Sequence, residues 1–209
     1  MSRIDELLAE HCPDGVQFRE LGTLGKRNKG TSITASQMKG LQSANGSIRV
    51  FAAGSTVADV EPDAVPAKDV IWSGGIIVKS RGNIAFERYS LPFTHKSELW
   101  SYTITDQDFS EQFVYYFLLT QQERLQDLAR SKSVKLPQLS VGDTDKLLIP
   151  APPLEVQFEI VRILDAMTSL QAELQAELAA RRSQYEFYRD SLLSFNNAGT
   201  PPLEVDGVG

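Results

Sequence analysis

The sequence predicts a mixed α/β (α+β) fold, in which a hairpin-rich domain is followed by one long helix of the coiled-coil type. Short β-type runs separated by Gly and Pro occupy much of residues 48–105, and a segment with helical spacing follows at 109–129. Residues 155–194 then contain neither Gly nor Pro. We therefore expect three parts: a domain over residues 1–152, a helix over 153–195 and a disordered tail over 196–209.

The first elements are expected to be short. Residues 2–10 have the pattern of an amphipathic helix, with Ser2 as its N-cap and Asp5 in the capping-box position. A Pro-Asp-Gly turn at 13–15 follows, and the alternation of apolar and polar residues over 16–21 predicts a half-buried strand. Residues 22–46 are rich in Gly, Ser, Thr, Asn and Lys, which favours a long loop with one short helix near 35–41.

The middle of the chain predicts a compact sheet and one helix. Phe113, Phe117 and Leu125 recur at helical intervals within 109–129, so this segment is expected to be an amphipathic helix. A polar loop over 130–137 leads to a last strand at 146–149. The expected strands that precede the helix are 48–53, 70–72, 76–79, 83–88 and 99–105.

The predicted long helix carries a regular apolar stripe. Its members recur about every 3.6 residues, close to the values for coiled coils and straight helices. About 40 residues make a rod of about 60 Å, which is too long to bury its stripe against one small domain and therefore needs a second helix. Arg181 occupies one stripe position. The expected dimerisation residues are Ile160, Leu164, Met167, Leu170, Leu174, Leu178, Tyr185, Tyr188 and Leu192.

Composition excludes several classes of protein. No apolar stretch of about 18 residues and no basic segment followed by an apolar one is present, which argues against a membrane or secreted protein. Cys12 has no partner for a disulfide, and with only His11 and His95 available no metal site is expected. These features fit a cytoplasmic protein.

The charge is distributed unevenly. The net charge of −6 argues mildly against nucleic acid as a partner. However, residues 21–50 contain five basic residues and no acidic one, whereas the acidic excess lies towards the two ends of the chain. A local basic surface therefore remains available for binding phosphate groups.

A specific motif spans the end of the domain and the start of the long helix. Residues 147–165 read LLIPAPPLEVQFEIVRILD, and this segment resembles the boundary of type I restriction-modification specificity subunits, where "I-P-x-P-P-L" precedes "E-x-Q-x-x-I-V-x-x-L-D". The prolines end a strand, and Glu155 suits the positive end of the helix dipole. Weaker resemblances occur at 12–22, at 106–119 and at 131–140, so together they cover about residues 1–195.

The resemblance implies how the chain works. Full-length members carry two target-recognition domains and two helices, and this chain resembles a half-length form with one of each. Each domain would read one half of a split sequence in double-stranded DNA, and antiparallel helices would set the spacing. Modification subunits, which bind S-adenosylmethionine, would dock on the assembly, and a restriction subunit is an optional further partner. The chain itself would need no cofactor.

No catalytic motif is recognisable in the chain. Pro152-Pro153 lacks the flanking Asn or Asp and aromatic residue of a base-holding methyltransferase motif, and no phosphate-binding Gly-rich loop is present. The carboxylate pairs Asp143/Asp145 and Asp106/Asp108 are interpreted as surface or capping residues. We expect no catalytic residue, so the chain would be the non-enzymatic specificity subunit.

Three basic clusters are the candidates for DNA contact. The first is the acid-free region, the second flanks a predicted hairpin turn, and the third lies in the loop before the last strand, where Gln138 could read adenine. Their members are Lys26, Arg27, Lys29, Lys39 and Arg49; Lys79, Arg81, Asn83 and Arg88; and Arg130, Lys132, Lys135 and Gln138.

Two readings of the function remain open at this point. In the first, the chain is a DNA reader that forms a homodimer through its helix, with Tyr185 and Tyr188 either closing the helix pair or docking a modification subunit. In the second, it is a scaffold or exchange partner that binds modification subunits through the helix and does not read DNA.

Overall fold

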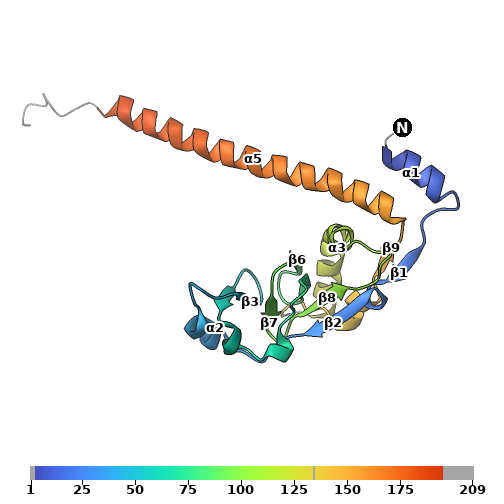
Figure 1. The fold of residues 1–209 in the computed structure, drawn as a ribbon. Helices are drawn as coiled ribbons and strands as arrows, with labels where there is room; N and C mark the ends of the chain where they lie inside the picture. The colour runs from blue at the N-terminus through green and yellow to red at the C-terminus, as the bar shows by residue number, and fades with distance from the viewer. Residues whose placement is uncertain (1–2, 134, 195–209) are drawn as a thin grey trace, which may run out of the picture. The chain divides into compact units, whose positions relative to one another are not determined.

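The computed structural model describes residues 3–133 and 135–194, so the proposed cap at Ser2 and the expected tail over 196–209 lie outside the described residues. The chain divides into two compact units, Met1–Arg162 and Ile163–Gly209. Nine strands lie in the described part of the first unit, and the mixed α/β class predicted from the sequence is confirmed (Figure 1).

A four-stranded antiparallel sheet forms the centre of the first unit. Its strand order is β2-β8-β5-β6, so β2 lies at one edge. The predicted strands at 76–79, 83–88 and 99–105 are observed with small shifts of their ends. The strand bounds are β2 Gly25–Lys29, β5 Gly75–Lys79, β6 Ala85–Tyr89 and β8 Trp100–Ile104.

Strand β2 corrects the expected loop over 22–46. Its polar sequence Gly-Lys-Arg-Asn-Lys has little of the composition of an isolated strand, but all five residues pair with β8 from Gly25↔Ile104 to Lys29↔Trp100. Pairing with an already buried neighbour overrides the weak local preference of the sequence. The short helix expected within the same region is observed as α2, Ala35–Leu41, with a capping box between Thr34 and Gln37.

A three-stranded sheet contains two strands that the sequence did not reveal. Its order is β4-β3-β7, with β4 at Val57–Val60, β3 at Ile48–Phe51 and β7 at Phe93–His95. The pair β3–β7 is parallel, which requires a long connection. The run expected at 70–72 forms only a bridge at Ile71, and Trp72 lies in the turn that follows.

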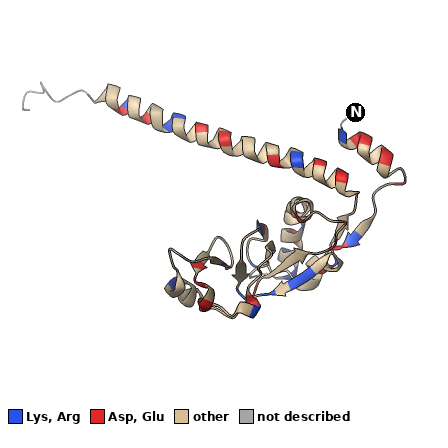
Figure 2. Ribbon diagram, viewed as in Figure 1, with Lys and Arg blue, Asp and Glu red and all other residues tan. Residues whose placement is uncertain are grey.

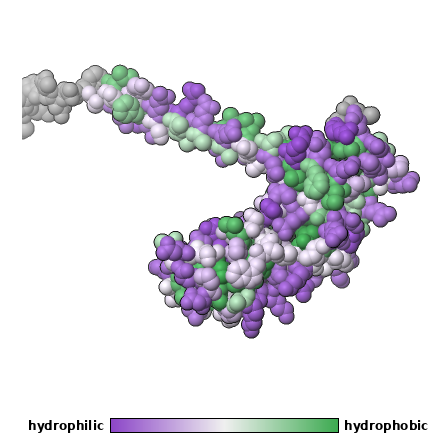
Figure 3. Space-filling model, viewed as in Figure 1, coloured by the Kyte–Doolittle hydropathy of each residue, from purple (hydrophilic) through white to green (hydrophobic). Residues whose placement is uncertain are grey.

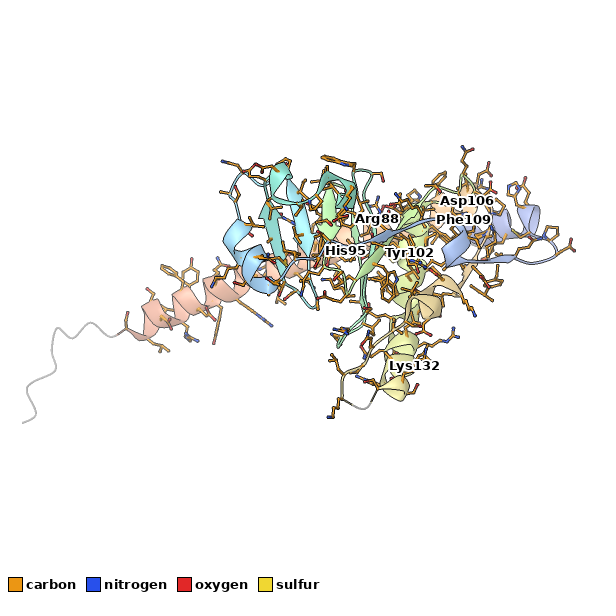
Figure 4. All side chains as sticks on the ribbon, turned by 90° about the horizontal axis from the view of Figure 1, so that it is seen from below. Arg88, His95, Tyr102, Asp106, Phe109 and Lys132 are labelled. Atoms are coloured by element: carbon orange, nitrogen blue, oxygen red, sulfur yellow. The ribbon has the colours of Figure 1, made fainter. Side chains whose placement is uncertain are left out.

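The remaining two strands pair across almost the whole domain. β1, Phe18–Glu20, is antiparallel to β9, Leu148–Pro150. This pairing brings the first strand and the last strand of the domain side by side. The guanidinium of Arg19 contacts the carboxylate of Asp106 at 2.6 Å and lies 5.4 Å from the centre of the Phe109 ring. Figure 4 labels Asp106 and Phe109 next to each other. These contacts fasten β1 to the loop that precedes the next helix.

Helix α3, Glu111–Lys132, covers one face of the central sheet. Val114, Leu118 and Leu125 are buried against Ile76 and Tyr102 of the sheet, so the predicted amphipathic helix is confirmed. It continues three residues past the predicted end, which places Arg130 and Lys132 in its last turn rather than in a loop. Basic residues there suit the negative end of the helix dipole.

Helices at both ends of the chain complete the described structure. α1 spans Arg3–His11, and a five-residue helix, α4, spans Val141–Asp145. The predicted long helix is observed as α5, Leu154–Leu193, with 40 residues. None of the described helices is both long enough and apolar enough to cross a membrane.

Candidate nucleic-acid interface

The candidate DNA-contact residues divide by whether their charge is already paired. Six of the cations contact an acidic side chain: Arg27 with Asp145, Arg49 with Asp59, Lys79 with Glu87, Arg88 with Glu111, Arg130 with Asp127, and Lys132 with Asp143. Within the described part of the chain, the other five have no acidic side chain at ion-pair distance. These five are Lys26, Lys29, Lys39, Arg81 and Lys135.

Two of the paired cations have evident roles within the fold. The Lys79 side chain is only 9% exposed, and its ammonium donates to the carbonyl of Gly54 and contacts Glu87, both at 2.6 Å. Arg49 forms two hydrogen bonds of 2.7 and 2.9 Å with Asp59, which raise the pKa of the guanidinium and lower that of the carboxyl. These contacts stabilise the domain and leave fewer donors for DNA.

A groove of about 610 Å³ runs beside the edge strand β2. Basic side chains from β2 and from the segment before β5 line it, and in Figure 2 this strand carries a band of blue. Lys68, which sequence reasoning did not select, adds a third lysine without an acidic contact in the described structure. The lining residues include Lys26, Arg27, Lys29, Lys68, Asp69 and Trp72.

The register of β2 determines which of its side chains remain available. Asn28 is buried, and its amide donates to the hydroxyls of Thr103 at 2.9 Å and Ser101 at 3.4 Å on β8. Side chains alternate along a strand, so Lys26 shares the face of Asn28 and Lys29 shares that of Arg27. The buried Asn28 therefore holds the strand while the lysines on either side of it stay exposed.

The other face of β2 is joined to a buried polar cluster. Asp145 accepts hydrogen bonds from Arg27 and from the hydroxyl of Tyr102, and Thr144 accepts from the indole of Trp100 at 3.0 Å. Burial raises the pKa of the Tyr102 hydroxyl, which stays a neutral donor. Asp145 is therefore a structural residue, and Asp143 and Asp106 accept capping hydrogen bonds from the amides of Ser140 and Asp108.

Residues of the second basic cluster, which flanks the hairpin turn, and of the third, from the loop before the last strand, meet at the turn between β5 and β6. The expected turn at Gly82-Asn83 connects β5 and β6, and Gly82 has a φ of +71°. The amide of Gly82 donates to the carbonyl of Pro137 at 2.9 Å, and a bridge joins Arg81 to Gln138. The structure thus brings together Arg81, Asn83, Lys135 and Gln138, all exposed. Lys132 lies near the end of α3, apart from Arg88 (Figure 4).

Gln126 of α3, which sequence reasoning missed, holds this hairpin in position. Its side-chain oxygen accepts from the amide of Ile84 at 2.7 Å, and its nitrogen donates to the carbonyl of Gly82 at 3.0 Å. The residue is 9% exposed although it is polar. A Gln among the apolar positions of a predicted helix was the only sign of this role in the sequence.

The boundary motif has a physical function that centres on Gln157. Its side chain is fully buried, accepts from the amide of Ser110 at 2.9 Å, and donates to the carbonyls of Asp108 and Pro152, both at 2.7 Å. The first turn of α5 is thereby fastened to the loop before α3. The Gln of the motif is therefore an anchor, a role that spacing alone did not reveal.

Beyond this anchor, the apolar stripe of α5 is exposed. The seven predicted dimerisation residues from Met167 to Leu192 are each more than half exposed, whereas Ile160 and Leu164 are partly covered. In Figure 3 hydrophobic patches recur along this helix between hydrophilic ones. A long exposed stripe of Leu, Met and Tyr is of the kind that coiled coils bury between helices.

No group of three or more metal-ligating side chains occurs in the described ranges of the chain.

Comparisons with known proteins identify the family. Residues 13–180 match the family model described as "Type I restriction modification DNA specificity domain". The EcoR124I/EcoR124II specificity subunit of Escherichia coli is 44% identical over 88 residues, which cover 40% of this chain and 21% of that protein. A Haemophilus influenzae protein described as "Putative type I restriction enzyme specificity subunit S.HindORF215P" is 31% identical over 147 residues, which cover 64% of this chain and 37% of that protein.

Structural similarity covers more of the chain. The crystal structure of a type I restriction-modification S subunit from M. genitalium has a TM-score of 0.61 at 20% sequence identity, over 88% of this chain and 47% of the other. At this identity the likeness shows a shared fold. The chain therefore spans about half the length of that subunit.

The two relatives named above are described as specificity subunits, which agrees with the expectation that the chain itself is not an enzyme. The family match covers most of the described residues, including the central sheet, α3 and about the first two thirds of α5. This chain belongs to the family of type I restriction-modification DNA specificity subunits.

Proposed function

We propose that the domain over residues 1–152 recognises double-stranded DNA and reads one half of a split target. The observation that carries this proposal is the groove beside β2, where Lys26, Lys29 and Lys68 present charge that no described acidic side chain neutralises. Lysines of this kind bind DNA phosphates and release counterions. The net charge of −6 does not oppose this, since the acidic excess lies elsewhere in the chain.

The hairpin surface supplies the second part of the proposed interface. Arg81, Asn83 and Gln138 have side chains that can form paired hydrogen bonds with base edges in the major groove. They are exposed and are held on a backbone fixed by Gln126. We assign base reading to these residues and phosphate binding chiefly to the lysines of the β2 groove and to Lys135. Lys39, exposed on α2, remains a candidate for phosphate contact.

A salt-dependent titration tests DNA recognition. The full chain is mixed with a labelled duplex of random sequence, and the affinity is measured by fluorescence anisotropy at several salt concentrations. Replacing Lys26, Lys29 or Lys68 with Ala is expected to reduce the slope of log K against log salt by about 0.9 each. Lys146→Ala serves as the control, because this exposed lysine lies outside the groove. Unchanged slopes in all three variants would contradict the proposed phosphate contacts.

We further propose that the helix over 153–195 pairs antiparallel with that of a second copy. The exposed stripe from Met167 to Leu192 supports this, because a two-fold dimer lets one patch pair with the same patch. Two domains related in this way would read an inverted-repeat split site. Light scattering on the full chain and on a version without residues 163–209, which keeps the Gln157 anchor, tests the proposal, and a monomeric full chain would contradict it.

Modification subunits are proposed to dock on this assembly, and the methyl donor S-adenosylmethionine would bind to them. Sequencing of methylated adenines in cells that express the chain with a modification subunit would reveal the half-sites. Complexes that contain modification subunits but show no DNA preference would instead support the scaffold reading, in which the helix alone provides the function.

A further inference from the structure

Trp72 is an exposed aromatic side chain at the edge of the groove beside β2. It is 59% exposed, whereas Trp100, the other tryptophan, is 8% exposed and donates its indole N–H to Thr144 at 3.0 Å. In the described structure the indole of Trp72 has no hydrogen-bond partner. Burying this large aromatic ring against a ligand would gain free energy that its exposed position leaves unused.

The backbone on both sides of Trp72 is firmly held. The amide of Ile71 donates to the carbonyl of Phe93 at 2.7 Å, and the amide of Phe93 donates back at 3.1 Å. Gly74 has a φ of +76°, and a Cβ at this position would lie 2.7 Å from the carbonyl oxygen of Tyr89. The tight turn therefore requires glycine, and β5 begins immediately after it. Trp72 is presented from a fixed turn between two paired segments.

The surroundings of Trp72 are basic. Lys26, Lys29 and Lys68 line the same groove, and Asp69 is the only acidic side chain among the lining residues. The hydroxyls of Thr103 and Thr105 complete a polar wall. An aromatic ring surrounded by lysines matches a ligand that combines anionic groups with flat, weakly polar rings, and nucleic acid has this combination.

We propose that Trp72 contacts the bases of DNA whose phosphates are held by the lysines of the β2 groove. The ring would insert part-way between two base pairs at a deformable step, as the apolar wedges of minor-groove binders do. This inference rests on the proposed function, because it assumes that the domain binds DNA there. It adds to that function a contact with bases that does not depend on charge.

The two tryptophans make a direct test possible. Binding of the random duplex is expected to quench the emission of the exposed Trp72, whereas the buried Trp100 keeps its emission. In the Trp72→Phe variant of the full chain, only Trp100 remains, and DNA is expected to cause little quenching. Anisotropy of the labelled duplex reports binding in the same samples, independently of either tryptophan.

Affinity provides the second readout. Trp72→Ala is expected to weaken binding by roughly 5- to 100-fold, the effect that loss of an aromatic partner of a base has in single-strand binding proteins. The slope of log K against log salt is expected to stay unchanged, whereas a lysine variant lowers it by about 0.9. Phe18→Ala is the matched control, since Phe18 is 57% exposed on β1 and does not line this groove. It is expected to bind as the original chain does.

The outcomes separate the two proposals. DNA binding that is unaffected by Trp72→Ala, with no quenching that depends on Trp72, would overturn the base contact and leave DNA recognition standing. A full chain that binds no DNA would overturn the proposed function itself. Loss of affinity together with a smaller salt slope would show that Trp72 acts only by positioning the lysines, and this would also overturn the base contact.

Discussion

The anchor at Gln157 can be tested by removing its hydrogen bonds while keeping its size. Gln157→Met preserves the length of the side chain and has a similar helix propensity. The variant leaves the amide of Ser110 and the carbonyls of Asp108 and Pro152 without this partner in a buried site. At about 1 kcal/mol for each lost hydrogen bond, the free energy of unfolding is expected to fall by about 3 kcal/mol.

Urea unfolding of the domain, followed by the emission of the buried Trp100, measures this change. Gln184→Met is the matched control, because Gln184 is exposed on the same helix and no hydrogen bond of its side chain is observed in the described structure. Its free energy of unfolding is expected to change by less than about 0.5 kcal/mol. Hydrogen exchange at the Ser110 amide should accelerate in the Gln157 variant only. Equal stability of the two variants would refute the assignment of Gln157 as an anchor.

Three further predictions concern the hairpin, the helix and pH. Gln126→Ala removes the hydrogen-bond partner of the Gly82 carbonyl and of the Ile84 amide, so the free energy of unfolding should fall by about 2 kcal/mol. Hydrogen exchange of the hairpin amides should accelerate, and unchanged exchange would contradict a positioning role. Leu174→Asp places a charge in the exposed stripe, and the mass measured by light scattering should fall from that of a dimer to that of a monomer. Ser183→Asp is the control, because Ser183 is exposed on the same helix but lies outside the stripe, and this variant should keep the dimer mass. Burial lowers the pKa of His95 in the folded chain from its ordinary value of 6.5. Below pH 6.5 the unfolded chain therefore binds more protons than the folded chain. The free energy of unfolding should fall by up to about 1.4 kcal/mol for each pH unit by which the pH is lowered. His95→Gln should flatten this part of the stability profile, and an unchanged slope would argue against a neutral buried His95.

The positions of the charged residues in the fold decide more about a binding surface than the net charge does. Six of the eleven candidate cations contact acidic side chains, and the nearly buried Lys79 contacts Glu87 within the fold. Basic residues of the acid-free stretch over 21–50 line the groove beside β2, and Lys68 joins them from a segment that the sequence did not single out. A sequence reports how many lysines are near one another along the chain, whereas ion pairing depends on which acids fold against them.

The sequence by itself determined the elements whose signal is local. The periodicity of 155–194 predicted helix α5, the spacing of 109–129 predicted α3, and the Pro-rich boundary motif pointed to the family that the comparisons then confirmed. Only the tertiary structure revealed strands β2, β4 and β7, the buried anchors Gln126 and Gln157, and the groove that combines Lys68 with Trp72. These features depend on strand pairing and hydrogen bonding between residues that are far apart in the chain. The sequence pattern of one segment does not show which distant segment will pair with it.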